Sequence, residues 1–338
     1  MRRLEAPHRR PGRGFRLLEK ATVVGWRAAT AVVARAPQAL ARAIVATAVQ
    51  TSYVVWPAKR RLSNANFGHV LGLPPDHPRV RRTALAAYRN YARYLVELMR
   101  LPSLPAERRA DLLEPHALDE AAEIWKTSNG MIVVCGHVGS NEAVAVGIAS
   151  NGWPISVVAD DSSFPELFEL LRRQRAEWGV QLIPWRNLRE MYRVLRRKEI
   201  LGLLVDWGYR PDGIPVRLFD AWTALPAGPA MLAAKTGATI LPLAIRRQPN
   251  GRYLVAHDPP LTVASSEPAE IQRATQAIAD AFERIVRAAP EQWYSFKPIW
   301  PETAGESAEL AARAGAAAPA GVTPTSAAAT PAPATGTS

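Results

Sequence analysis

From residue 130 onward, short apolar runs alternate with segments of helical pattern, and this alternation constrains the fold more than any other feature of the sequence. The runs have the length of strands and read MIVVC, PISVVA, VQLIP, ILGLLV, ATILPLAI and RYLVA. The helical patterns cover residues 141–150, 164–178, 187–198, 226–236 and 268–289. We therefore predict an α/β fold with a mixed, largely parallel sheet flanked by helices. Ligands of such sheets bind beyond the carboxyl ends of the strands.

The N-terminal 60 residues combine a basic leader with a stretch rich in Ala, Val and Ile. Basic residues interrupt the stretch, so it lacks the roughly 18 consecutive apolar residues of a clear membrane-spanning helix. At 100° per residue, five cations project within about a third of the helix circumference; they are Arg16, Lys20, Arg27, Arg35 and Arg42. We predict a helix that lies in a membrane interface, anchored by Trp26, Tyr53 and Trp56 and kinked or divided at Pro37. The alternative is an amphipathic helix packed on its own domain.

Residues 61–302 are predicted to form the main domain. Its helical part, 61–128, contains amphipathic patterns at 79–100 and 118–126, and its α/β part covers 129–302. The tail at 303–338 consists mainly of Ala, Pro, Thr, Ser and Gly, and we predict that it is disordered because it has few apolar side chains to bury.

The composition restricts the partners and excludes some kinds of site. With 42 Lys and Arg against 30 Asp and Glu, the chain is attracted to anions such as nucleic acid, an anionic membrane surface or an acidic substrate. Cys135 is the only cysteine, which excludes an intrachain disulfide and a cysteine-rich zinc site. His69, His77, His116 and His257 lack ligand-like spacing, so no metal site is predicted. The sequence contains neither a P-loop nor a G-x-G-x-x-G fingerprint.

The stretch GHVGSNE joins the predicted strand MIVVC to the next helix and carries the candidate chemistry. His137 would lie at the carboxyl end of the strand and Glu142 in the first helical turn. There Glu142 could hold one imidazole nitrogen, so that the other nitrogen takes a proton from an alcohol. The backbone N–H groups at the helix start could receive an oxyanion. Without further context, a helix-capping histidine and a solvated glutamate explain the same spacing. A nucleophilic Cys135 is a further alternative, but we favour a small buried residue there.

The block GMIVVCGHVGSNEA resembles the H-x4-D/E motif of the lysophospholipid acyltransferase superfamily. Further blocks extend the similarity over about residues 61–300 and narrow it to the lipid A late acyltransferases and the actinobacterial phosphatidylinositol mannoside acyltransferases. The blocks include RRLSNANFGHVLG, RRTALAAYRNYARYLVELMR, RRQRAEWGVQLIP, LREMYRVLRRKEILGLLVDWGYRPDGIPVRLFD and PEQWYSFKPIW. The resemblance implies a fold similar to glycerol-3-phosphate acyltransferase and the transfer of a fatty acyl chain from acyl-CoA or acyl-ACP to a hydroxyl of a membrane glycolipid or lysolipid.

The resemblance also implies roles for single residues. His137 matches the general base and Glu142 the carboxylate that orients it, with no covalent acyl-enzyme. Arg175 matches an arginine near substrate phosphates, and Arg189 is a second candidate for that role, although both could lie on solvated helix faces. Asp206 matches the first acid of the family's DQD or DRD block, but the sequence DWGYR lacks the second acid, so Asp206 could instead anchor its loop through Arg210.

These features together predict an O-acyltransferase, peripheral or monotopic at the cytoplasmic face of the inner membrane. It would use a membrane lipid acceptor and an acyl-CoA or acyl-ACP co-substrate, without a cofactor and without nucleic acid. The acceptor stays open between a lipid A precursor, a mannosylated phosphoinositide and another glycolipid, and DWGYRPDGIPVRLFD slightly favours the second. Two alternatives are a basic protein that binds anionic lipid or nucleic acid without catalysis, and a lipid thioesterase or hydrolase that uses the same dyad.

Overall fold

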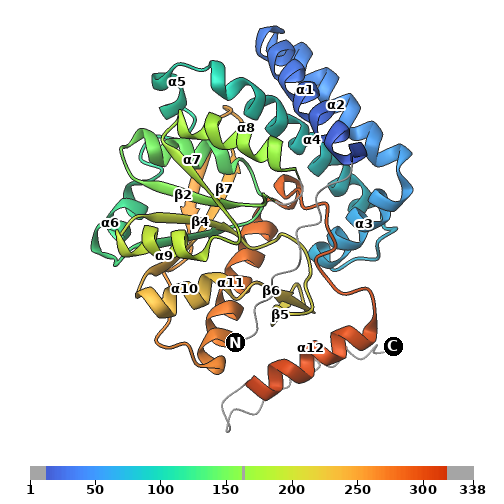
Figure 1. Cartoon of the computed structure of the whole chain (residues 1–338). Coiled ribbons are helices and arrows are strands. Elements are labelled where there is room, and N and C mark those ends of the chain that lie inside the picture. Colours follow the sequence, from blue (N-terminus) through green and yellow to red (C-terminus); the bar gives the residue numbers. More distant parts are fainter. Residues whose placement is uncertain (1–12, 162–163, 318–338) are drawn as a thin grey trace, which may run out of the picture.

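The computed structural model describes residues 13–161 and 164–317 of the 338-residue chain, so residues 1–12 of the basic leader lie outside the described residues (Figure 1). A six-stranded sheet with the order β3-β2-β4-β1-β7-β8 forms its centre. The strands are β1 Met131–Cys135, β2 Ile155–Ala159, β3 Val180–Pro184, β4 Ile200–Leu204, β7 Thr239–Arg247 and β8 Tyr253–His257. All six predicted runs therefore form strands.

The sheet is largely parallel, as predicted. The pairs β1–β4, β1–β7, β2–β3 and β2–β4 are parallel, and β8 runs antiparallel to β7. The five predicted helices are also present, as α7 Asn141–Ser150, α8 Pro165–Ala176, α9 Leu188–Arg196, α10 Gly228–Thr236 and α11 Pro268–Ala288. The α/β class is thereby confirmed.

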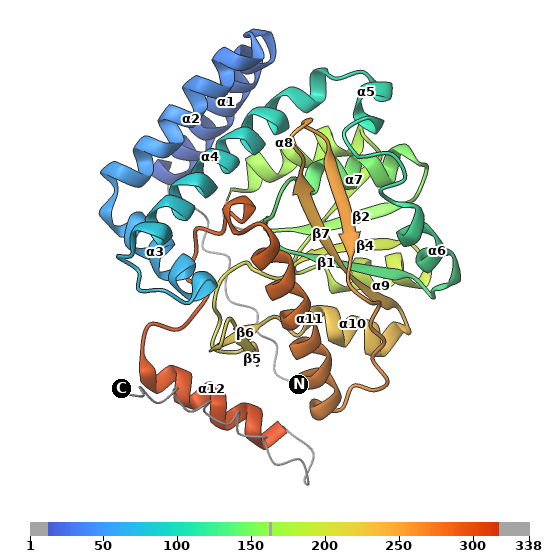
Figure 2. The ribbon, with the colours of Figure 1, turned by 180° about the vertical axis from the view of Figure 1, so that it is seen from behind.

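Both faces of the sheet are buried. Successive side chains of β1 point to opposite faces: Ile132 and Val134 join one apolar cluster with α9, α10 and α11, whereas Met131, Val133 and Cys135 join another with α6 and α7. Figure 2 shows α11 lying across the first of these faces. Burial on both sides explains why β1 is a continuous apolar run rather than an alternating one.

The helices before the sheet form a separate layer beside it. They are α1 Arg13–Arg35, α2 Gln38–Val55, α3 Pro57–Leu71 and α4 Pro78–Arg100, followed by a 3-10 turn at Leu101–Ser103, α5 Ala106–Ala110 and α6 Asp119–Thr127. The chain breaks between α1 and α2 at Pro37, as predicted. In both ribbon views α4 lies between the α1–α2 pair and the sheet (Figures 1 and 2).

The outer surface of α2 is apolar, whereas that of α1 mixes apolar side chains with the exposed cations Lys20, Arg27 and Arg35. Among the described residues, six of the ten exposed large hydrophobic residues lie on these two helices, and Trp56 directly follows α2; the six are Val24, Val32, Leu40, Ile44, Val54 and Val55. Of the three predicted membrane anchors only Trp56 is exposed, because Tyr53 is buried and donates a hydrogen bond to Asn64 Oδ1 at 2.8 Å, and Trp26 packs against the small core between α1, α2 and α4. The prediction is therefore wrong for Tyr53, whereas the anchoring role of Trp26, which is only partly buried, stays a prediction.

Within the described residues, no single helix has the length and apolar composition of a membrane span. Taken together, α2 and α3 have the required length and composition, but the chain bends by 93° at the break between them.

A β-hairpin and a helix near the end of the described chain were not predicted. The strands β5 Ile214–Leu218 and β6 Ala221–Leu225 form a hairpin, whose two turn residues Phe219 and Asp220 have positive φ values of 49° and 59°, as two-residue hairpin turns require. Helix α12, Ala304–Ala317, packs on this hairpin: Leu310 is buried, and Arg313 donates to the carbonyls of Pro211 and Gly213 at 2.6 Å each. The predicted disorder of the tail is therefore wrong for α12, since alanine favours helix and Leu310 provides a docking contact. Residues 318–338 lie outside the described part.

Candidate functional site

The loop between β1 and α7 carries the H-x4-E motif. His137 follows the last residue of β1 by two positions and lies at the carboxyl edge of the sheet, as predicted. The loop ends at Ser140, whose Oγ accepts a hydrogen bond from the backbone N–H of Ala143 at 3.3 Å and caps α7. Because β1 lies beside β4 in the sheet, the carboxyl end of β4 reaches the same place: Val205 N–H donates to the carbonyl of Cys135 at 3.0 Å.

Asp206, delivered by β4, holds the imidazole of His137. Its Oδ1 lies 2.8 Å from His137 Nδ1, and its Oδ2 accepts the backbone N–H of His137 at 2.9 Å. The Asp206 side chain is fully buried, whereas 26% of the His137 side chain remains exposed. A carboxylate on Nδ1 keeps the proton there and leaves Nε2 as the basic nitrogen. The structure thus contains an oriented histidine with an accessible imidazole.

The partner of His137 differs from the predicted one. The hydrogen bonds of the described residues join Glu142 to Arg175 as an ion pair and to the Tyr94 hydroxyl at 2.8 Å, and none of them joins Glu142 to His137. The first turn of α7 directs Glu142 towards α4 and α8, while the parallel neighbour of β1 supplies Asp206. The alternative in which Asp206 anchors its loop through Arg210 is also wrong, because Arg210 pairs with Asp212 at 3.0 Å.

The pKa values of the pair follow from its burial and charge. Burial lowers the pKa of His137, but the charge of Asp206, the hydrogen bond to it and the charge of Glu142 outweigh burial, so the pKa is raised. Burial raises the pKa of Asp206, but the charge of the His137 imidazole and the hydrogen bonds from His137 and Trp293 outweigh burial. The pKa is therefore lowered, and the carboxyl is ionised. The pair is therefore arranged to stabilise an imidazolium that forms at His137.

Glu142 is ionised for a different reason. Burial raises its pKa, but the charge of Arg175 and the hydrogen bonds from Arg175 and Tyr94 outweigh burial and lower it. Burial and the Glu142 charge hold the pKa of Tyr94 well above its ordinary value, so the hydroxyl stays a donor. Arg175 and Glu142 are each 13% exposed. The largely buried guanidinium of Arg175 is thus held by Glu142 at the start of α7, directly after the His137 loop.

Two glycines of the motif are required by close packing. A Cβ atom at Gly136 would overlap the Phe282 ring and lie 3.1 Å from Asp206 Oδ2. Gly139 has a φ of 65°, and a Cβ there would collide with the carbonyl of Ile245. These glycines let the His137 loop approach Asp206 and β7 closely.

The segment after α11 forms hydrogen bonds with the His137 loop. After a 3-10 turn at Pro290–Gln292, Tyr294 N–H donates to the His137 carbonyl at 2.9 Å, and Gly139 N–H donates to the Gln292 carbonyl at 3.2 Å. The Tyr294 hydroxyl donates to the Gly139 carbonyl at 3.0 Å, and Trp293 Nε1 donates to Asp206 Oδ2 at 2.8 Å. The sequence alone did not indicate that WYSFKPIW makes these contacts. Its unusual density of tyrosine and tryptophan donors was the available signal.

A rim of cations and aromatic rings borders His137. Trp207 is 45% exposed, its ring centroid lies 6.2 Å from that of His137, and Lys297 Nζ lies 3.4 Å from the centroid of the indole. Further along the edge, the guanidinium of Arg210 lies 5.8 Å from the Trp185 ring. Arg189 is exposed on α9, and no hydrogen bond of the described residues connects it to His137 or Glu142. The geometry therefore places Arg210 next to Trp185, beyond the end of β3, and brings neither Arg210 nor Arg189 into contact with His137.

Cys135 does not have the properties of a nucleophile. It is buried, its Sγ lies 3.5 Å from Asn141 Oδ1, and burial together with the charges of Asp206 and Glu142 raises the pKa of the thiol. In the described part of the chain, no three His, Cys, Asp or Glu side chains gather in a way that could hold a metal ion.

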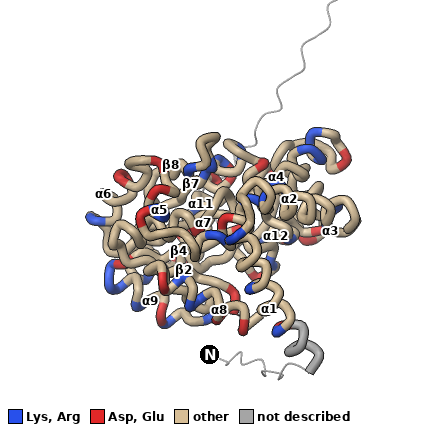
Figure 3. Tube along the Cα trace, turned by 90° about the horizontal axis from the view of Figure 1, so that it is seen from above, with Lys and Arg blue, Asp and Glu red and all other residues tan. Residues whose placement is uncertain are grey.

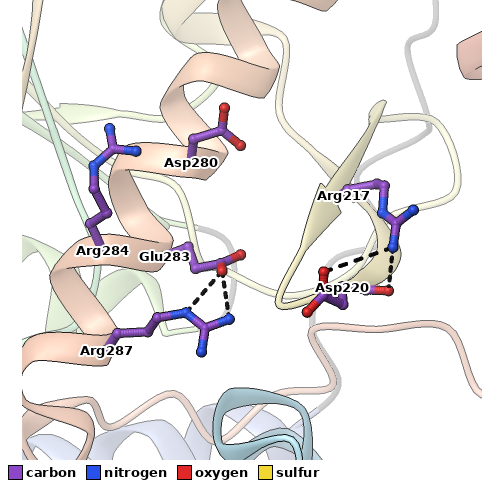
Figure 4. A pocket seen from close by; sticks show the side chains of 6 residues that line it. All are labelled: Arg217, Asp220, Asp280, Glu283, Arg284 and Arg287. Carbon is purple, nitrogen blue, oxygen red and sulfur yellow. Dashed lines mark hydrogen bonds and ion pairs between the residues drawn. The ribbon is translucent and has the colours of Figure 1, made fainter. Parts of the chain in front are cut away.

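Two pockets lie outside the immediate surroundings of His137. A surface pocket of about 330 Å³ lies between the β5–β6 hairpin and α11 (Figure 4), and its charges pair with one another, Arg287 with Glu283 and Arg217 with Asp220. A second pocket, of about 140 Å³, reaches Glu142 between α2 and α4 and is lined partly by leucines. Its volume lies below the roughly 300 Å³ at which ligand pockets usually begin, so it does not by itself hold a whole fatty acyl chain.

Comparisons with known proteins relate the chain to bacterial acyltransferases. The profile of the family described as bacterial lipid A biosynthesis acyltransferase matches residues 13–302. A phosphatidylinositol mannoside acyltransferase of Mycolicibacterium smegmatis is 27% identical over 294 residues, which cover 85% of this chain and 92% of the relative. A phosphatidylinositol mannoside acyltransferase of Mycobacterium tuberculosis is 27% identical over 252 residues, which cover 72% of this chain and 77% of the relative.

Proposed function

The chain belongs to the bacterial lipid A biosynthesis acyltransferase family, and from this premise we propose that it moves a fatty acyl chain from acyl-CoA or acyl-ACP to a hydroxyl of a membrane glycolipid, with His137 as the general base. The observation that carries the mechanism is the 2.8 Å contact between His137 Nδ1 and Asp206 Oδ1, which leaves Nε2 free to accept a proton.

Each step of the reaction balances without an enzyme-bound acyl group. Nε2 of His137 takes the proton of the acceptor hydroxyl while the hydroxyl oxygen attacks the thioester carbonyl. The new C–O bond forms and the C–S bond breaks. The imidazolium, stabilised by Asp206, then returns the proton to the departing thiolate. Asp206 acts through His137 and does not itself transfer a proton.

Glu142 serves the site through Arg175. A guanidinium held by a carboxylate keeps further N–H donors for a substrate phosphate, and its planar fork suits that group. Glu142 also contributes to the raised pKa of His137 through its charge. On this proposal Arg175 binds a phosphate of the acceptor or the donor, and Glu142 fixes its position.

The proposed acceptor is a mannosylated phosphoinositide. The similar proteins are named for that substrate class. Trp207 and Lys297 beside His137 suit a phosphate-bearing sugar headgroup, because an ammonium group binds phosphate and an indole ring packs on apolar surfaces. A lipid A precursor is the other candidate.

The proposed location is the cytoplasmic face of the membrane, where a lipid acceptor and a soluble thioester meet. The apolar outer surface of α2, together with the exposed Val24 and Val32 of α1, supports this location, since large exposed apolar patches mark membrane or partner contacts. Lys20, Arg27 and Arg35 are exposed on α1, near anionic headgroups in this orientation.

Lipid mass spectrometry of a deletion strain tests the function. One acyl chain should be missing from a single glycolipid class. This acyl chain should be restored when the strain carries the wild-type gene but not when it carries the His137→Ala variant. An unchanged lipidome contradicts the proposal.

A non-catalytic basic protein would instead bind polyanions in a salt-sensitive manner. Its binding would be unaffected by His137→Ala, and it would not turn over a thioester. In the view of Figure 3, basic and acidic residues are interspersed over the molecule. This view shows no continuous basic surface of the kind that binds a polyanion.

A further inference from the structure

The carboxylate of Asp206 accepts three hydrogen bonds, and only two come from His137. Oδ1 accepts from His137 Nδ1, whereas Oδ2 accepts from the His137 backbone N–H at 2.9 Å and from Trp293 Nε1 at 2.8 Å. Trp293 has no exposed surface. A buried indole N–H that lacked this partner would be costly, and a carboxylate without it would carry less compensated charge.

The indole is held so that its N–H keeps pointing at Asp206. Its ring packs edge to face against Phe67 of α3, with centroids 5.5 Å apart, and against Phe282 of α11, with centroids 6.2 Å apart. The backbone of Trp293 forms an antiparallel bridge with Val138, next to the catalytic histidine. A single residue is thus fixed to the loop of His137 by its backbone and to the carboxylate of Asp206 by its side chain.

We propose that Trp293 is a positioning residue that limits the basicity of His137 by sharing the charge of Asp206. The inference rests on the proposed role of His137 as general base. An N–H donor draws negative charge towards Oδ2, so less is available to stabilise an imidazolium at Oδ1. The same bond fixes the carboxylate plane, so that Oδ1 stays directed at Nδ1 and the imidazole keeps its tautomer.

Two variants remove the N–H donor. Trp293→Phe keeps an aromatic ring, and replacement of Trp293 by 3-benzothienylalanine keeps the bicyclic shape and exchanges the N–H for sulfur, which preserves the packing against Phe67 and Phe282. In both, the pKa of His137 should rise by about half a unit to one unit. The acid limb of the kcat profile should move to higher pH by the same amount. At the plateau kcat should fall about 10-fold with KM little changed, because the lost bond orients a group that acts in the transition state.

Trp300→Phe is the matched control. Trp300 is also a buried tryptophan of the same segment, but its Nε1 donates to the carbonyl of Leu218 at 3.1 Å rather than to a catalytic group. The substitution removes a buried indole N–H and the same number of atoms. The pKa of His137 and the acid limb should stay at their wild-type values.

The pKa is measured directly by NMR titration of the full-length protein in detergent, with ¹³C at histidine Cε1. The chain has six histidines, and the signal of His137 is assigned by its loss in His137→Gln. An unchanged His137 pKa in both Trp293 variants overturns the inference, and so does an equal shift in Trp300→Phe. The titration needs no turnover. A raised His137 pKa in a protein that transfers no acyl group would therefore support the role of Trp293 and contradict the proposed function.

Discussion

At the scale of single residues, the site depends on a carboxylate that the sequence motif does not contain. The spacing H-x4-E places Glu142 five residues after His137, which suggests a direct pair. The sheet instead brings Asp206, 69 residues away, to 2.8 Å from the imidazole. Adjacent parallel strands end at the same edge, and the β1–β4 register is a property of the fold rather than of local spacing. The sequence therefore identified His137, Glu142 and Asp206 but not which carboxylate holds the histidine.

Asp206→Asn should move the pH dependence of acyl transfer to lower pH. In the wild-type protein the Asp206 charge raises the pKa of His137, so the neutral base is lost as pH falls through that raised value. Without the charge, burial dominates and lowers the pKa, and the acid limb of kcat/KM shifts down. The plateau rate should fall on the order of 10²- to 10⁴-fold, since the imidazolium loses its partner. Asp119→Asn, at an exposed carboxylate of α6, should leave the profile unchanged.

Glu142→Gln should act mainly on substrate binding. The amide can still accept from Tyr94 but cannot neutralise Arg175, so Arg175 loses its fixed position and KM for the phosphate-bearing substrate should rise about 10-fold or more. The acid limb should move down by less than in Asp206→Asn, because the Glu142 charge reaches His137 only through space. Steady-state kinetics at several pH values measure both effects. If Glu142→Gln shifted the acid limb as far as Asp206→Asn does, Glu142 and not only Asp206 would orient His137, which would contradict this account.

At the scale of elements, continuous apolar runs and long helical patterns were predictable, whereas interrupted runs and an Ala-rich helix were not. The strands of the sheet are continuous apolar runs because both faces are covered, and helices α7 to α11 carry patterns long enough to identify. The hairpin strands β5 and β6, IPVRL and AWTAL, are not continuous apolar runs, and the turn residues Phe219 and Asp220 are not the usual Asn-Gly. Helix α12 was missed because one leucine in an alanine-rich segment is a weak sign of packing.

Leu310→Ala should release α12 from the hairpin. Leu310 is 1% exposed, and removing a buried leucine side chain typically costs about 2–5 kcal/mol. Hydrogen exchange of the amides in α12 should therefore become at least about 10-fold faster, while exchange in β1 stays slow. Leu188→Ala, at a leucine that is 56% exposed, is the control and should change neither region. Unprotected α12 amides in the wild-type protein would show that the helix does not dock in solution.

The double change Leu40→Glu and Ile44→Glu should weaken binding to phosphatidylglycerol vesicles about 10-fold or more. The two side chains are 52% and 59% exposed, so their replacement leaves the core intact but places charge where apolar surface would meet lipid. Vesicle flotation measures the bound fraction. Thr127→Glu, on α6 away from the α1–α2 pair, adds charge without touching that surface and should bind as the wild type does (Figure 1). Equal binding by the double variant would contradict the membrane role of α1 and α2.

At the scale of the whole molecule, distant parts of the chain meet at one edge of the sheet. Tyr94 comes from the helical layer, His137 and Glu142 from the first βα unit, Asp206 from β4 and Trp293 from the segment after α11. The class of fold and the position of His137 follow from local patterns. The contacts between these parts depend on the strand order and on the packing of α4 and α11, which local patterns do not encode. The acyltransferase family of the chain and the geometry of the pair together support one chemistry, base-assisted attack of an alcohol on a thioester.

The most direct test follows the products of the purified protein, given an acyl thioester and a mannosylated phosphatidylinositol, by mass spectrometry with simultaneous measurement of released thiol. Wild-type protein should yield one acylated lipid for each thiol released, and His137→Gln should lower this rate by on the order of 10²-fold or more. Thiol release accompanied only by free fatty acid, or an undiminished rate in His137→Gln, would contradict the account.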